Sequence, residues 1–201
     1  MFMITFALFS ALATFYFTMF VTPGPNNSML TFSGLKFGFV RTLPHAIGIP
    51  LGHIFQIGLT CFGLGKIFLI YPQIQFYMKI LCFLYLLYLA WKMIGSFDMV
   101  KKEIGRPLRF YEASLFQFIN PKAWSIAITV ASGFFPTEEN IFIGILFVTI
   151  TAAVICFPSI CVWALFGSSL KKYISNYRVK KYTEYSLALM VVSTGFFILL
   201  K

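Results

Sequence analysis

Long apolar runs separated by short polar breaks dominate this chain. The first run extends from Phe2 to Val21 without a charged side chain, and about 20 apolar residues suffice for one helical crossing of a bilayer. Further apolar runs cover residues 42–70, 74–94, 113–135, 141–166 and 186–200, of which the last is the shortest. The pattern predicts an all-α polytopic membrane protein with about six transmembrane helices.

Composition supports this class. Hydrophobic residues make up 59% of the 201 residues and charged residues only 11%, whereas about 25% of the residues in soluble domains are charged. So few charged side chains cannot cover the surface of a soluble domain of this length. The composition therefore excludes a soluble protein.

The net charge of +10 comes from 16 Lys and Arg against 6 Asp and Glu. The basic residues concentrate in alternate connections: Lys36 and Arg41; Lys101, Lys102, Arg106 and Arg109; Lys171, Lys172, Arg178, Lys180 and Lys181. Short loops rich in Lys and Arg stay on the cytoplasmic side, next to anionic lipid. We therefore expect a multi-pass protein of the cytoplasmic (inner) membrane with both termini outside. The positive charge does not indicate nucleic-acid binding.

Acidic residues are absent before Asp98, and all six lie in or beside polar breaks: Asp98, Glu103, Glu112, Glu138, Glu139 and Glu184. We therefore expect no carboxylate in the membrane interior. His45 and His53 are then the only groups in the predicted spans that titrate near neutral pH. They are candidates for proton coupling; the alternative is a hydrogen-bonded imidazole that stays neutral.

Two helix-breaking motifs occupy corresponding places. Six spans form two sets of three, and an odd number in each set inverts the second set relative to the first. The predicted organisation is a repeat over residues 1–96, a basic loop over 97–112 and a second repeat over 113–201. Each repeat begins with an apolar segment interrupted by proline next to asparagine, and broken helices at matching positions indicate a transport site.

The candidate substrate-binding residues come from these two breaks. They are Pro23, Gly24, Pro25, Asn26, Asn27, Gln117, Asn120, Pro121 and Lys122. Proline leaves backbone carbonyls without helical partners, and these carbonyls can face a ligand. The alternative for the first break is a plain loop, followed by a short amphipathic piece over residues 28–40. Lys122 has two open interpretations: it binds a substrate carboxylate, or it extends to the lipid headgroups. The GxxxG spacings Gly34/Gly38 and Gly48/Gly52 favour close helix packing.

Four stretches together resemble the lysine-exporter (LysE/RhtB) family of translocators. They are residues 20–26 (FVTPGPN), residues 34–38 (GLKFG), Met78-Lys79 with residues 85–89 (YLLYL) and Trp91-Lys92, and Phe116-Gln117 with residues 120–123 (NPKA). The resemblance covers the whole chain in order. It implies an inverted repeat and a cytoplasmic-membrane exporter of amino acids or similar metabolites, driven by the proton gradient. Two departures are Cys82-Phe83, where the family has small residues, and His53, where members often carry an acid.

These features favour a secondary active exporter that works by alternating access. The missing buried acid favours neutral amino acids or derivatives over lysine and arginine, whose side-chain cations would lack a partner. The partners expected are an amino-acid substrate, protons and membrane lipids, and a homo-oligomer is compatible with the sequence. We expect no cofactor and no metal site.

Other classes of function remain open to different degrees. An enzyme is disfavoured, because the chain has neither an HExxH motif nor paired aspartates in its spans. The alternatives are a metal-ion or thiol/electron carrier of related architecture, or a structural membrane protein that transports nothing. Cys61, Cys82, Cys156 and Cys161 form no CxxC pair and are interpreted as buried thiols.

Overall fold

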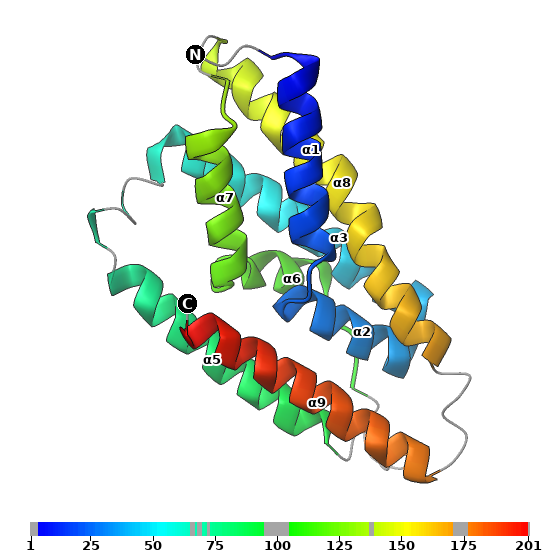
Figure 1. The fold of residues 1–201 in the computed structure, drawn as a ribbon. Helices are drawn as coiled ribbons and strands as arrows, with labels where there is room; N and C mark the ends of the chain where they lie inside the picture. The colour runs from blue at the N-terminus through cyan, green and yellow to red at the C-terminus, as the bar shows by residue number, and fades with distance from the viewer. Residues whose placement is uncertain are drawn as a thin grey trace.

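The computed structural model describes residues 4–64, 67, 70–71, 73–94, 105–136, 139–170 and 177–200. The basic residues Lys66, Lys101, Lys102, Lys171 and Lys172 and the turn residue Pro72 lie outside these ranges. The elements described are α1 (Phe6–Val21), α2 (Pro25–Phe37), α3 (Phe39–Leu59), the π-helical turn η1 (Thr60–Leu64), α5 (Gln73–Met93), α6 (Phe110–Phe116), α7 (Pro121–Gly133), α8 (Ile141–Leu170) and α9 (Tyr177–Leu200). The predicted all-α class is confirmed (Figure 1).

The first apolar run forms a helix that breaks where the motif predicts. The Oγ1 of Thr5 accepts a hydrogen bond from the backbone N–H of Leu8 at 3.1 Å and caps the start of α1. Every fourth residue of α1 is buried, and this stripe packs against α8: Leu8, Leu12, Tyr16 and Phe20. Pro25 occupies the first turn of α2, a position that needs no backbone N–H. The two helices meet at a bend of 55°.

Helix α2 differs from the amphipathic piece expected there. Nine of its residues are buried, because α8, α3 and α9 all pack against it. At the crossing with α8, a Cβ on Gly34 would lie 2.1 Å from the carbonyl oxygen of Ala164. In return, a Cβ on Gly167 would lie 2.0 Å from the carbonyl oxygen of Thr31. Only glycine permits this approach of the two backbones.

Gly38 is a hinge and makes no close packing contact. Its φ is +86°, and a Cβ there would have no neighbour within 4 Å. This left-handed conformation ends α2 at Phe37, and α3 begins at Phe39, directly after Gly38. The GxxxG interpretation of Gly34 and Gly38 therefore holds for Gly34 alone.

Helix α3 is shorter than the predicted span over 42–70. It continues through Pro44 and Pro50 to Leu59, and the following π-helical turn contains Gly63 at a φ of 116°. The other glycine pair does support close packing. A Cβ on Gly48 would lie 2.2 Å from the carbonyl oxygen of Phe110, and one on Gly52 would lie 2.4 Å from that of Ser114. Helix α6 is thereby held directly against α3.

The second half contains the predicted interruption, with α6 ending at Phe116 and α7 beginning at Pro121. Helix α8 extends over 30 residues through Pro158. Helix α9 begins at Tyr177, well before the apolar run at 186–200. The added turns carry Glu184, whose exposure is only 3%. Glu184 is thus buried against neighbouring helices, and the absence of carboxylates from the membrane interior stays a prediction. Asp98, Glu103 and Glu138 lie outside the described residues.

The helices enclose two hydrophobic clusters. The larger joins α1, α3, α7 and α8 around residues such as Tyr16, Ile49 and Val148. The smaller joins α5 and α9, which lie side by side along one edge of the molecule, to parts of α2 and α6 (Figure 1). Residues next to the helix breaks belong to both clusters, Phe20 to the larger and Phe116 to the smaller.

Two stretches of helix are by themselves long and apolar enough to cross a membrane, residues 39–63 and 141–170, within the part of the chain described. Helices α1 and α2 together qualify as one bent span, and α5 carries a shorter apolar stretch over 76–91. The count of six crossings stays a prediction.

The close crossing of α2 and α8 predicts that alanine is destabilising at Gly167 but not at a glycine outside the crossing. Gly167→Ala places a methyl group on a backbone carbonyl, and overpacking of this kind costs about 1–3 kcal/mol or more. We expect a clearly lower melting temperature for the detergent-purified variant, measured by intrinsic fluorescence. Gly133→Ala is the control, because a Cβ at Gly133 meets nothing within 4 Å; equal melting temperatures for the two variants would contradict the crossing.

Candidate functional site

The two helix breaks contact each other, although about 100 residues separate them in sequence. The Nζ of Lys122, on the first turn of α7, donates hydrogen bonds to the carbonyl oxygens of Thr22 at 2.7 Å and Pro23 at 3.4 Å. Gly24 makes room for this lysine, since a Cβ there would lie 2.9 Å from its Cδ. A cation from the second break thus binds carbonyls freed by the first.

A reciprocal amide pair joins the same breaks. The Nδ2 of Asn26 donates to the Oε1 of Gln117 at 2.9 Å, and the Nε2 of Gln117 donates to the Oδ1 of Asn26 at 3.2 Å. Gln117 is fully buried and also donates from Nε2 to the carbonyl oxygen of Ala113 at 2.8 Å. We call the region formed by Lys122, the Asn26–Gln117 pair and the carbonyls of Thr22 and Pro23 the break junction.

Helix α3 extends the break junction through Gln56. The Nε2 of this buried residue donates to the carbonyl oxygen of Gln117 at 3.1 Å, and its Oε1 lies 3.1 Å from the Nδ1 of His53. The His53 ring also meets the edge of Phe20, with centroids 5.3 Å apart. Sequence reasoning missed Gln56. Its position three residues after His53, on the same helix face, is the signal that could have identified it.

Asn27 and Asn120 use their side chains to hold the backbone at the breaks. The Nδ2 of Asn27 donates to the carbonyl oxygens of Phe20 at 2.9 Å and Thr22 at 2.8 Å, at the end of α1. The Oδ1 of Asn120 accepts from the backbone N–H of Lys122 at 3.1 Å and caps α7. Pro121 follows at the first helical position, as Pro25 does in α2. These residues hold the backbone of the break junction in place, and Asn27 and Asn120 also border the small cavity between the breaks.

Little open space remains at the break junction. A cavity of about 20 Å³ lies between the breaks, bordered by Gly24, Asn26, His53, Asn120 and Lys122. This volume is about that of one water molecule. The breaks are therefore in contact, and an amino acid can enter only if the helices that carry them move apart.

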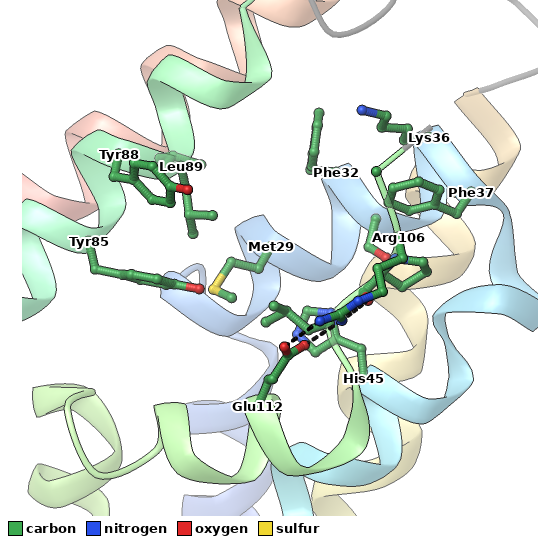
Figure 2. A pocket seen from close by; sticks show the side chains of 15 residues that line it. Met29, Phe32, Lys36, Phe37, His45, Tyr85, Tyr88, Leu89, Arg106 and Glu112 are labelled. Atoms are coloured by element: carbon green, nitrogen blue, oxygen red, sulfur yellow. Dashed lines mark hydrogen bonds and ion pairs between the residues drawn. The ribbon is translucent and has the colours of Figure 1, made fainter. Parts of the chain in front are cut away.

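A second, larger cavity of about 440 Å³ lies between α2, α3, α5, α9 and the segment that precedes α6 (Figure 2). His45 borders this cavity, so the structure separates it from His53 at the break junction. Both histidines are 2% exposed, but among the described residues the ring nitrogens of His45 have no hydrogen-bond partner. The two proton-coupling candidates thus have different surroundings.

An ion pair forms part of the wall of this cavity. The guanidinium of Arg106 donates two hydrogen bonds of 2.6 Å to the carboxylate of Glu112. The backbone N–H of Arg109 donates a third, at 2.7 Å, to the same carboxylate. The Arg106 guanidinium, assisted by this N–H, lowers the pKa of Glu112 to about 2. Glu112 therefore remains ionised at neutral pH.

Cysteine and metal chemistry have little geometric support in the described residues. Cys61, Cys82, Cys156 and Cys161 are all free thiols. The described ranges bring no three His, Cys, Asp or Glu side chains together in a way that could hold a metal ion.

Comparison with known proteins identifies the class. The LysE type translocator family matches residues 17–201, and the chain belongs to this family. The protein is therefore a transporter and not an enzyme. No solved structure matches the chain.

Curated relatives cover most of the chain. The Cysteine/O-acetylserine efflux protein of Salmonella typhi is 29% identical over 172 residues, which are 85% of this chain and 87% of the relative. The protein of the same name from Escherichia coli (strain K12) is 27% identical over the same extent.

The amide pair of the break junction predicts an energetic coupling. In a double-mutant cycle, Asn26→Ala and Gln117→Ala each lower the free energy of unfolding. We expect the sum of these two losses to exceed the loss in the double variant by about 1 kcal/mol. The free energy of unfolding in mixed micelles gives this value. Asn26→Ala with Asn140→Ala is the control cycle, because Asn140 caps α8 outside the break junction. We expect it to be additive within about 0.5 kcal/mol, and the same additivity in the test cycle would show that the two amides do not interact.

Proposed function

We propose that this protein is a secondary active exporter of neutral amino acids or their derivatives, and that it binds them at the break junction. The observation that carries the proposal is the contact of the two breaks through a polar network, of which Gln117 is the buried part. Such a site offers donors and acceptors for an ammonium and a carboxylate group, but no acid that would pair with a cationic side chain. The curated relatives named above carry the names of two neutral compounds, cysteine and O-acetylserine, in agreement with this class of substrate.

The ligands for the zwitterionic head follow from the present contacts. Lys122 would turn its Nζ from the carbonyls of Thr22 and Pro23 to the substrate carboxylate. The two carbonyls, released from the lysine, would then accept hydrogen bonds from the substrate ammonium. Asn26 and Gln117 would exchange their mutual pair for contacts with the substrate, which links binding to separation of the breaks.

We further propose that the helices form two inverted repeats, over residues 1–96 and 113–201. Helices α1 and α2 would correspond to α6 and α7, α3 to α8, and α5 to α9. In support, α3 packs against α8 and α5 against α9, and an axis relating two halves brings corresponding helices together in this way. Alternating access would then be a movement of one set against the other around the break junction.

We propose the orientation that the loop charges predict, with both termini on the outer side of the cytoplasmic membrane. Lys36, Arg41, Arg106 and Arg109 would then face the cytoplasm together. The cavity of about 440 Å³, bordered by Lys36 and Arg106, would open to the same side. An exporter loads its substrate from there.

Coupling to protons is assigned to His53. It is buried at the break junction and bonded to Gln56, which itself contacts the second break. A change in the protonation of His53 would alter the hydrogen bond to Gln56 and, through it, the contact between the breaks. His45 is the weaker candidate, because it has no such connection in the structure.

The role of Lys122 is tested by transport in reconstituted vesicles. We expect the full-length protein to transport O-acetyl-L-serine and L-cysteine but not L-lysine. Lys122→Met should lower transport about tenfold or more, because a charge-assisted hydrogen bond is worth about 1.5–3 kcal/mol, and Lys122→Arg should retain part of it. Ser125→Ala is the matched control, one turn further along α7 on an exposed face. Transport of lysine alone, or equal rates for Lys122→Met and Ser125→Ala, would contradict the proposed site.

The role of His53 is tested by the response to a pH gradient. Glutamine keeps a hydrogen-bonding side chain next to Gln56 but cannot titrate. We expect His53→Gln to lose the acceleration of transport by an imposed gradient and to retain gradient-independent exchange of labelled for unlabelled substrate. The exchange assay is the internal control for folding and binding. A variant that still accelerates like the wild type would rule out His53 as the coupling group.

A further inference from the structure

The cavity of about 440 Å³ has the properties of a binding site separate from the break junction. Its volume lies within the range of about 300–1,000 Å³ that is typical of ligand pockets. Its walls combine apolar surface with a few polar groups. Met29, Phe32, Leu89 and Val191 contribute apolar side chains. None of the residues in the two break motifs borders it.

Unsatisfied polar atoms point to a ligand in this cavity. His45 is buried, borders the cavity and has no partner for either ring nitrogen. Buried polar side-chain atoms in proteins nearly always have a hydrogen-bond partner. Both ring nitrogens are covered by neighbouring atoms, so a ligand in the cavity becomes their partner only when a side chain of the wall moves aside; Figure 2 shows the ring next to the Arg106–Glu112 pair.

The charged groups of the wall balance one another. Arg106 and Glu112 form a two-pronged ion pair, with side chains exposed by 50% and 28% respectively. A zwitterion can insert into such a pair and replace both partners at once, its carboxylate on the guanidinium and its ammonium on the carboxylate. A ligand with only one of these charges would leave either Arg106 or Glu112 without a counter-ion.

The wall that carries these groups is held rigidly. The backbones of α3 and α6 touch at Gly48 and Gly52, and the Oγ of Ser114 donates to the carbonyl oxygen of Gly48 at 2.8 Å. His45 on α3 and Glu112 on α6 are therefore fixed relative to each other. The opposite wall belongs to α5 and α9, which form the second hydrophobic cluster.

A further cation borders the cavity. The Nζ of Lys36 lies 5.9 Å from the ring centroid of Phe32 and 5.5 Å from that of Phe37. An uncharged side chain of a substrate fits the apolar surface of the cavity.

We propose that this cavity is a loading site that binds the zwitterionic head of a neutral amino acid before it reaches the break junction. Arg106 binds the carboxylate, Glu112 the ammonium group, and His45 a further polar atom of the ligand. The proposal rests on the proposed export function. It adds to the break junction a second binding site, whose residues contribute to substrate specificity.

The test compares Arg106→Gln with Arg109→Gln in the vesicle assay with O-acetyl-L-serine. Arg109 is in the same segment, but its guanidinium donates to the hydroxyl of Tyr111 at 3.0 Å and does not border the cavity. We expect Arg106→Gln to raise the KM about tenfold and Arg109→Gln to leave it unchanged. Glu112→Gln should also raise the KM, but Glu112 binds the backbone at the start of α6 as well, so Arg106→Gln is the decisive variant.

A competition experiment separates ligand binding from a structural role. The methyl ester of O-acetyl-L-serine lacks the carboxylate, so it should compete weakly with the parent compound on the wild type. On Arg106→Gln the preference for the parent compound should become much smaller, because one of the two proposed carboxylate-binding groups is gone and only Lys122 at the break junction remains. A general loss of structure would not reduce this preference selectively.

The outcomes distinguish the two proposals. If the wild type transports O-acetyl-L-serine and Arg106→Gln has the KM of Arg109→Gln, the loading site is wrong and the export function stands. If the wild type transports none of the amino acids, the proposed function is wrong. Calorimetric binding of O-acetyl-L-serine to the purified protein then decides the loading site by itself: binding that Arg106→Gln loses supports it, and absence of binding overturns it.

Discussion

The structure depends on hydrogen-bond partners for the backbone that two interrupted helices expose inside an apolar bundle. An unpaired carbonyl costs several kcal/mol in such surroundings, so each break needs donors from elsewhere in the chain. Lys122 provides a donor for Thr22 and Pro23, and Asn27 provides one for the end of α1. The two breaks thereby satisfy each other, and their contact can be exchanged for contacts with a ligand.

Glycine positions determine which parts of the bundle stay together. Gly34 and Gly167 bring α2 onto α8, and Gly48 and Gly52 bring α6 onto α3, at distances that exclude any side chain. Helices α5 and α9 instead pack through larger side chains in the smaller cluster, which also includes Met29 and Leu35 of α2 and Phe116 of α6. This division gives the larger cavity one rigid wall and one wall from a separate pair of helices, an arrangement suited to opening and closing around a substrate.

Much of the fold was predictable from local chemistry. Proline combined with glycine or asparagine at 23–27 and 120–121 marks an interruption more strongly than the single prolines that stay inside α3 and α8, so both breaks were visible in the sequence. The burial of α2 was not, because its residues include several polar ones and only contact with α8, α3 and α9 covers them. The burial of Glu184 was not predictable for a similar reason: α9 begins before the apolar run, and packing of this helix covers the acid.

The sequence by itself determined the membrane class, the two break motifs and the residue types available at a transport site. Apolar length, proline geometry and loop charge are local properties that need no partner. Only the tertiary structure decided that Lys122 bonds to the opposite break, that Gln56 links His53 to Gln117, and that His45 belongs to a separate cavity. These contacts join residues far apart in the chain, and their distances follow from helix packing, which no local pattern encodes.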